Sequence, residues 1–199
     1  VPVPTWLKVI SIVDSIGMVI PVMAFLINIW YTAKGRLGVL QNDTAAKFVF
    51  TGTIFYFIVS IQGSVMALPQ VQRITHFNNW VVGHAHIGVF AFAGMIALGG
   101  IYYVLPRVVG KPLYSKFLVD VQYWLILIGA IGFAVVLTIV GLVQGNSWYN
   151  GETIYRVLPQ VHIYYVIRAS LGVTIFTGAL IGMYNIFRTI FYTPGEVTS

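Results

Sequence analysis

The 199 residues are 58% hydrophobic and 8% charged. A water-soluble domain carries charge on about a quarter of its residues, so the composition excludes a soluble enzyme or soluble binding module. No cysteine is present, which excludes disulfides, thiolate metal sites and covalent haem attachment within these residues. The net charge of +6 comes from basic residues dispersed in short loops, so it does not indicate nucleic-acid binding.

Apolar segments of about 20 residues can cross a bilayer core of roughly 30 Å as helices. Five such segments follow one another along the chain, with short loops between them. The pattern predicts an all-α fold: a polytopic transmembrane helix bundle of five helices, forming a single integral membrane domain over residues 1–199. The predicted spans are Trp6–Tyr31, Phe48–Leu68, Trp80–Leu105, Phe117–Val143 and Val161–Phe187.

Basic residues are concentrated in the first and third of the four connections between these spans. The second connection holds only Arg73 and the fourth only Arg156. By the positive-inside rule, the first and third connections face the cytoplasm, so the N-terminus lies outside and the C-terminus is cytoplasmic. The basic residues of the two cytoplasmic connections are Lys34, Arg36, Lys47, Arg107, Lys111 and Lys116.

Polar side chains at membrane depth are costly and usually functional or paired. The first predicted span carries Asn28 in its inner half, and the second carries Tyr56 at a similar depth. Tyr56 belongs to a polar stripe whose members recur at three- or four-residue steps on one helix face. Such a stripe either binds helices together or carries protons, and both interpretations are open. The stripe consists of Thr53, Tyr56, Ser60 and Ser64.

Gly83-His84-Ala85-His86 stands near the start of the third predicted span. An α-helix turns 100° per residue, so these two imidazoles point about 200° apart and cannot close on one metal ion. They can each bind a different metal on opposite flanks of one helix. Because both desolvated rings need partners, the pair predicts metal or haem ligation. His162, in the fifth predicted span, is either a further ligand or a hydrogen-bonding core residue.

Gly83-His84-Ala85-His86, followed by Gly99–Arg107, resembles the tenth helix of the catalytic subunit of haem–copper oxidases, especially the C-family (cbb-type) cytochrome c oxidases. Val161–Ala169 and Tyr184-Asn185 resemble that family's last helix. The resemblance implies that the chain is the C-terminal part of a twelve-helix subunit, helices eight to twelve. It also implies reduction of dioxygen to water with electrons from cytochrome c, coupled to proton uptake, in the bacterial inner membrane.

The resemblance assigns expected roles to individual residues. His84 corresponds to the proximal ligand of the high-spin b-type haem, and His86 to one axial ligand of the low-spin b-type haem. His76 and Arg168 stand where the family neutralises haem propionates, and a guanidinium forms strong charge-assisted hydrogen bonds with a carboxylate. The expected cofactors are therefore two b-type haems and a copper ion.

The resemblance also identifies residues of a proton path, and the sequence departs from the family at one position beside the proximal histidine. Asn28 and Tyr56 match positions on the family's single proton-uptake path. Gln62 stands where the family usually has a glutamate, thought to hydrogen-bond the proximal histidine. A neutral amide makes that imidazole less anionic than a carboxylate would, so the haem potential is expected to be higher.

The histidine count limits what these residues can do alone. A complete site needs six histidine ligands, whereas the chain has four histidines, two of them poorly placed for copper. The copper ligands are therefore expected on the family's other helices, supplied by another chain or by a preceding part of the polypeptide. Other expected partners are membrane-anchored c-type cytochrome subunits and membrane lipid. A nitric oxide reductase-like subunit and a non-catalytic b-haem membrane anchor are left as alternatives.

Overall fold

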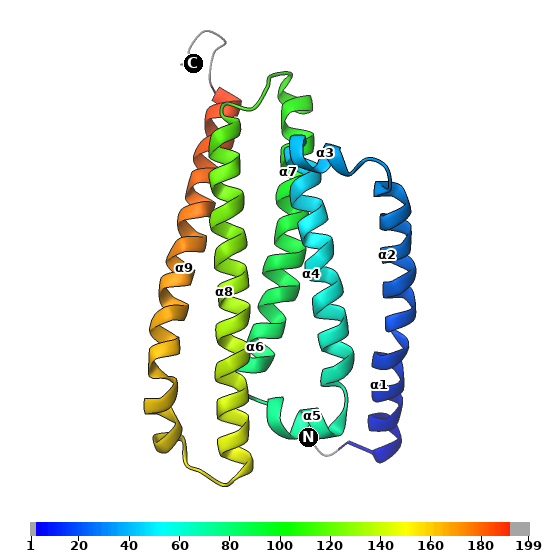
Figure 1. Ribbon diagram of the computed structural model, residues 1–199, viewed down its shortest axis with the longest axis vertical. Coiled ribbons are helices and arrows are strands. Elements are labelled where there is room, and N and C mark those ends of the chain that lie inside the picture. Colours follow the sequence, from blue (N-terminus) through cyan, green and yellow to red (C-terminus); the bar gives the residue numbers. More distant parts are fainter. Residues whose placement is uncertain (1–2, 192–199) are drawn as a thin grey trace.

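The computed structural model describes residues 3–191, which contain helices and no strand. An all-α bundle with five helices long and apolar enough to cross a membrane is confirmed. The elements form one row in projection, from α9 and α8 at one side to α1 and α2 at the other (Figure 1). In chain order they are α1 Thr5–Gly17, α2 Val19–Ala33, α3 Leu37–Asn42, α4 Thr44–Met66, α5 Pro69–Thr75, α6 Asn79–His86, a π-helical segment Ile87–Gly94, α7 Met95–Val109, α8 Lys116–Tyr149 and α9 Ile154–Phe191.

Several helices extend beyond the predicted spans. Helix α8 continues to Tyr149, six residues past Val143, and α9 begins at Ile154 and passes through Pro159. Apolarity marks only the part of a helix inside the hydrocarbon, whereas the helix itself continues into the headgroup region. A proline near a helix start removes only one backbone hydrogen bond, so Pro159 does not end α9.

The first crossing is two helices rather than the continuous one that was predicted. Helix α1 ends at Gly17 and α2 begins at Val19, with Met18 between them. Pro21 lies in the first turn of α2, where its missing N–H leaves no helical carbonyl without a donor. Glycine and proline at this spacing account for the break.

Short polar caps set where the internal helices begin. Asp43 Oδ1 accepts a hydrogen bond of 2.8 Å from the N–H of Ala46 at the start of α4. Asn78 Oδ1 accepts one of 2.9 Å from the N–H of Trp80, which fixes the first turn of α6. Such caps stabilise a helix by about 1 kcal/mol, and the second one defines where the histidine-bearing helix starts.

Neighbouring helices in the row pack side by side. Helices α8 and α9 form a long antiparallel hairpin, α6 packs on α8, and α4 packs on α7 and on the π-helical segment. The α1–α2 crossing packs mainly on α4. Buried apolar side chains form three clusters between these helices, one of them around Phe48 and Met95 and another around Val140 and Val161.

Helix α8 approaches the start of α6 unusually closely, because two glycines on one face of α8 leave no side chain in the way. A Cβ at Gly141 would overlap the backbone of Trp80, and a Cβ at Gly145 would overlap the carbonyl oxygen of Ile74. Glycines four residues apart are a common contact surface between membrane helices. The position of α6 is therefore set by backbone contact with α8.

Candidate functional site

The start of α6 is held by three polar side chains from three helices. Asn79 Nδ2 donates to Gln144 Oε1 at 2.7 Å and to the Tyr165 hydroxyl at 3.0 Å. Gln144 Nε2 donates to the same hydroxyl at 2.9 Å, and Gln144 Oε1 also accepts from the N–H of Asn79 at 3.1 Å. Hydrogen bonds of this kind hold membrane helices in register. We call Asn79, Gln144 and Tyr165 the amide–tyrosine cluster.

His84 points from α6 toward α4. Its Nδ1 lies 3.2 Å from Gln62 Oε1, and its ring stacks parallel to that of Trp80 with centroids 6.1 Å apart. A Cβ added at Gly63 would touch the Cε1 and Nε2 side of the ring, so the glycine keeps that edge of the imidazole clear. Gln62 thus contacts His84, as the resemblance implies for this position.

His86 points the other way, toward α8 and α9. Its Nδ1 lies 2.7 Å from the carbonyl oxygen of Val82 on its own helix. The ring packs against Phe133, with centroids 4.9 Å apart. A cavity of about 120 Å³ adjoins it, bordered by Phe133 and by Ile175 of α9. The two imidazoles therefore lie on different sides of α6.

The hydrogen bonds define which nitrogen of each ring is available to a metal. The acceptors are an amide oxygen and a carbonyl oxygen, so each Nδ1 carries the proton and donates. Each Nε2 then keeps its lone pair, the pattern usual for a histidine that ligates a metal. The donor set therefore fits two separate haem irons, one on His84 and one on His86.

Over residues 3–191, no group of three His, Cys, Asp or Glu side chains lies close enough together to hold a metal ion. The described residues thus offer separate imidazoles rather than a cluster of side chains around one site. A haem iron already has four nitrogen ligands from the macrocycle, so one protein imidazole suffices to attach it.

Changing Gln62 tests the contact with His84. A carboxylate at position 62 would bind the Nδ1–H by a charge-assisted hydrogen bond and make the ring more electron-donating. The carboxylate stabilises the ferric iron more than the ferrous iron. If this difference equals the roughly 1.4 kcal/mol by which a charge-assisted bond exceeds a neutral one, Gln62→Glu lowers the midpoint potential of the proposed His84 haem by about 60 mV. Redox titration of the purified complex measures this, and the potential of the second haem serves as the internal control. Equal shifts at both haems would contradict a specific effect through His84.

His76 and Arg168 lie at the same end of the bundle but are not brought together. His76 follows α5, and its ring contacts that of Phe77 with centroids 3.9 Å apart. It borders a cavity of about 670 Å³ between α1 and α5 that Lys8 and Arg73 also line. The Arg168 guanidinium lies 5.1 Å from the ring centroid of Tyr165, beside the amide–tyrosine cluster. The two side chains therefore lie beside different parts of the bundle, His76 next to α1 and Arg168 next to the amide–tyrosine cluster.

The structure also places Tyr56 and Asn28, the two expected proton-path residues. The ring of Tyr56 lies against Phe25 of α2 and Phe92, with centroids 5.3 and 4.8 Å away. It lines a cavity of about 300 Å³ between α4 and the α1–α2 crossing, together with Ser60 and Ser64. Asn28 lies on an exposed face of α2, outside the residues that border this cavity.

The polar stripe on α4 has two kinds of member. Ser64 Oγ donates to the carbonyl oxygen of Ser15 in α1 at 2.9 Å, which is a packing contact between helices. Thr53 Oγ1 donates to the carbonyl oxygen of Val49 at 2.9 Å, within α4. Tyr56 and Ser60 line the cavity and are the members that remain candidates for moving protons.

The amide–tyrosine cluster was not predicted from the sequence. Its members lie on three helices, so no spacing within one helix could identify it. One signal was available: Asn79 and His86 are seven residues apart, which places them on the same helix face about 10 Å apart along the axis. A polar residue two turns from a ligand, on the ligand's own face, is a candidate for positioning it.

These features define a class of protein: a polytopic helical membrane protein in which one helix presents two imidazoles to different sides. A comparison with protein families agrees with that class. The family described as "Cytochrome C and Quinol oxidase polypeptide I" matches residues 1–175. The chain belongs to this family.

Several curated relatives are similar to most of the chain. "Cytochrome c oxidase subunit 1 homolog" of Agrobacterium tumefaciens is 31% identical over 195 residues, covering 94% of the chain and 36% of the relative. "Cbb3-type cytochrome c oxidase subunit CcoN1" of Stutzerimonas stutzeri is 27% identical, covering 94% and 41%. "Cytochrome c oxidase subunit 1" of Rhodobacter capsulatus is 28% identical, covering 96% and 37%. The chain thus spans less than half the length of these relatives.

Proposed function

We propose that the chain is the haem-binding part of the catalytic subunit of a cbb-type cytochrome c oxidase. In this function it takes part in reducing dioxygen to water with electrons from cytochrome c, coupled to proton uptake. The observation that carries the proposal is the pair of Nε2 lone pairs on different sides of α6, each left available by a hydrogen bond from Nδ1. Two separate imidazole ligands on one helix suit two haems held side by side.

Each residue of the site has a separate role in the proposed function. His84 Nε2 binds the iron of the high-spin haem and His86 Nε2 that of the low-spin haem. When bound, the haems supply electron transfer and, at the high-spin iron, dioxygen binding. Gln62 holds the His84 ring through Nδ1, and the cluster at Asn79 fixes the helix on which both ligands lie. His76 and Arg168 supply positive charge at the level where propionates extend.

The same proposal fixes the orientation and the partners. Basic residues are concentrated in the connections after α2 and after α7, so these two connections face the cytoplasm of a bacterium. The end of the bundle that bears α5 then faces outward. Copper is held by helices outside these 199 residues, contributed by another chain or by another part of the polypeptide. Membrane-anchored c-type cytochromes deliver the electrons.

Haem content and ligand reactivity test the proposal. The purified complex is expected to give a pyridine haemochrome spectrum of b-type haem at two per catalytic unit, in addition to any c-type haem of its partners. One of the two should react with carbon monoxide, because only the high-spin iron has an open coordination position. A complex without any carbon monoxide-reactive b haem would overturn the assignment of His84.

A nitric oxide reductase-like subunit is the second candidate, favoured by one observation. Gln62 occupies the position beside His84 where the oxidases usually have a glutamate, and such neighbours of the proximal histidine differ between the two classes. Metal analysis of the complex separates them. Copper supports the oxidase, and iron in excess of the haem count supports the reductase.

A non-catalytic membrane anchor would bind one haem between two histidines of this chain, which requires His162 together with His84 or His86. His162 is exposed on α9 and does not line the cavity beside His86. His162→Ala is therefore expected to leave both b haems bound, as measured by the low-spin spectrum and by carbon monoxide binding. Loss of a haem in this variant would favour the anchor.

A further inference from the structure

A long apolar groove lies between α4 and α8. Its volume is about 660 Å³. Thr51 and Tyr123 border one end, whereas Gln62 and Thr138 border the other, and isoleucines including Ile58 and Ile131 form its walls. The groove thus follows the two helices from the end that bears α3 almost to the level of His84.

The groove opens on a face of the row of helices and adjoins the histidine sites only at its inner wall. There Gln62 contacts His84, and Ile87 and Ala134 separate the groove from the cavity beside His86.

On α4, the cavity beside Tyr56 is lined by a different face of the helix, and that face is covered by the α1–α2 crossing. On α8, Gly129 and Gly132 contact α9, whereas Ile131 lies in the groove. Neither α9 nor α2 covers it, so the groove is an outward-facing surface of the row of helices.

The length of the groove corresponds to one leaflet of a membrane. Eleven residues of α4 separate Thr51 from Gln62, which is about 16 Å along a helix axis, and fifteen residues of α8 separate Tyr123 from Thr138, which is about 22 Å. Half of a hydrocarbon core of roughly 30 Å is about 15 Å. The groove is therefore long enough for a single extended acyl chain of the leaflet on the α3 side, and it matches that chain in polarity.

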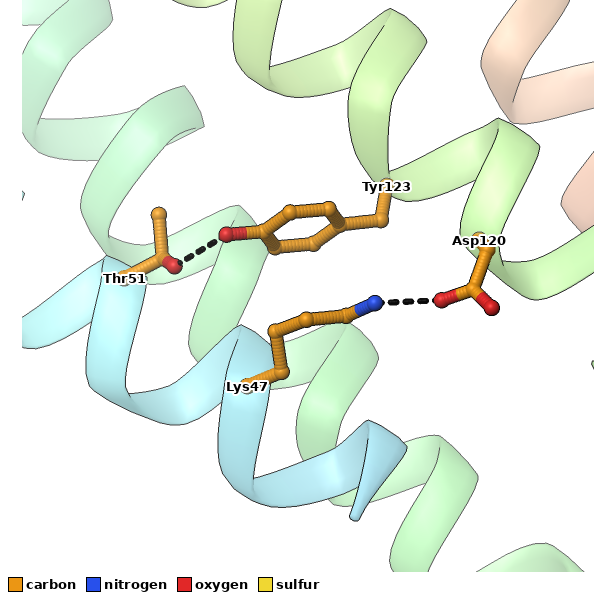
Figure 2. Close-up of polar contacts among 4 residues, drawn as sticks. All are labelled: Lys47, Thr51, Asp120 and Tyr123. Atoms are coloured by element: carbon orange, nitrogen blue, oxygen red, sulfur yellow. Dashed lines mark hydrogen bonds and ion pairs between the residues drawn. The ribbon is translucent and has the colours of Figure 1, made fainter. Parts of the chain in front are cut away.

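An ion pair lies where the headgroup of such a lipid would be. Lys47 Nζ binds Asp120 one turn beyond the Thr51–Tyr123 pair, whose hydroxyls are 2.7 Å apart (Figure 2). The Lys47 side chain is 22% exposed and that of Asp120 52% exposed. The ammonium and carboxylate thus lie side by side at the mouth of an apolar groove, in the order cation on α4 and anion on α8.

This arrangement selects among lipids. Lipid tails are as apolar as the groove, so an acyl chain gains little from the transfer itself, and specificity has to come from the headgroup. A phosphate pairs with Lys47 by charge-assisted hydrogen bonds. The more exposed Asp120 repels a purely anionic headgroup and pairs with an ammonium group. A headgroup carrying phosphate and primary ammonium complements both.

We propose that the groove between α4 and α8 is a binding site for one phosphatidylethanolamine molecule of the adjoining leaflet. One acyl chain lies between Ile58 and Ile131, the phosphate contacts Lys47, and the ammonium contacts Asp120. The lipid fills the space between α4 and α8 on this face of the bundle, and so it stabilises the packing of the two helices.

The first test fills the groove. Ile131→Trp places an indole in it, whereas Ile128→Trp makes the same change one turn away on α8, at a residue that is 57% exposed and does not line the groove. Complete oxidase complexes containing each variant are washed in detergent until bulk lipid is removed, and retained lipid is measured by native mass spectrometry. The wild type and Ile128→Trp should keep one phosphatidylethanolamine that Ile131→Trp loses. Equal retention in both tryptophan variants would overturn the site.

The second test examines the headgroup. Delipidated complexes are titrated with nanodiscs of phosphatidylethanolamine or phosphatidylglycerol, and thermal stability is followed. The wild type should be stabilised at lower concentrations of phosphatidylethanolamine. Asp120→Asn should reduce this preference about tenfold, the factor that one charge-assisted hydrogen bond contributes. A preference for phosphatidylglycerol in the wild type would refute the proposed role of Asp120.

A helix of another subunit is the competing occupant. Because these 199 residues contain no cysteine, Ile131→Cys introduces a single thiol into this part of the complex. On our proposal it reacts with a lipid-soluble maleimide and forms no crosslink to another subunit with a short bifunctional reagent. An efficient crosslink would assign the groove to a protein partner and overturn the lipid site.

Discussion

His84→Ala is expected to abolish carbon monoxide binding to b haem in the complex while leaving the low-spin spectrum intact. His86→Ala is expected to do the reverse. The reason is geometric: the two rings lie on different sides of α6, one against Gln62 of α4 and the other against Phe133 of α8. Removing one imidazole leaves the surroundings of the other unchanged. Optical spectra of the reduced complex, with and without carbon monoxide, measure both effects.

One outcome of this pair of variants would contradict the prediction, and one further variant serves as its control. Loss of the same single haem in both variants would refute two separate sites, because it would mean that the histidines serve one iron. Trp80→Phe is a suitable control, since it keeps an aromatic ring beside His84 but removes no ligand. Both haems should be present in that variant.

Tyr56→Phe is expected to slow turnover by about 10² or more, the usual scale for removing a group that transfers a proton. On the proposed function, oxygen reduction near the outer surface draws protons from the cytoplasm, and hydrocarbon offers no route without polar side chains. The substitution removes only the hydroxyl. The ring contacts with Phe25 and Phe92 are kept, so haem content and thermal stability should be close to wild type. Oxygen consumption by the purified complex measures the effect.

The matched control for this prediction is Tyr103→Phe. Tyr103 is an exposed residue on α7 whose ring contacts the guanidinium of Arg107, and phenylalanine preserves that contact. Turnover should be unaffected there. Normal turnover in Tyr56→Phe as well would mean that the α4 stripe binds helices together and that protons enter elsewhere.

Hydrophobicity alone predicted the five crossings correctly, because a helix inside hydrocarbon has to be apolar over its whole buried length. It did not predict where the helices end, since α8 and α9 continue into regions where polar residues are tolerated. The break at Met18 and the π-helical segment after His86 were also missed. Both depend on backbone hydrogen bonding in a particular packing environment, and a hydropathy pattern does not report that.

The helical angle of 200° correctly predicted that His84 and His86 face different sides, because both residues lie within α6. The contact of Gln62 with His84, implied by resemblance, is present in the structure. Tertiary partners were harder to predict: the cluster of Asn79, Gln144 and Tyr165 joins residues 65 and 86 positions apart. The cavity that Tyr56 lines, and the position of Asn28 outside it, likewise depend on how two crossings pack.

The contacts of α6 with α8 and α9 form late during synthesis, because the residues that make them follow α6 in the chain. His84 and His86 leave the ribosome well before Gly141, Gly145 and Tyr165, which hold their helix in place. About 80 residues separate His86 from Tyr165. At 5–20 residues per second, translation needs roughly 4 to 16 s to reach the last of the residues that hold α6. During biogenesis the two ligands therefore enter the membrane several seconds before the scaffold that orients them is complete.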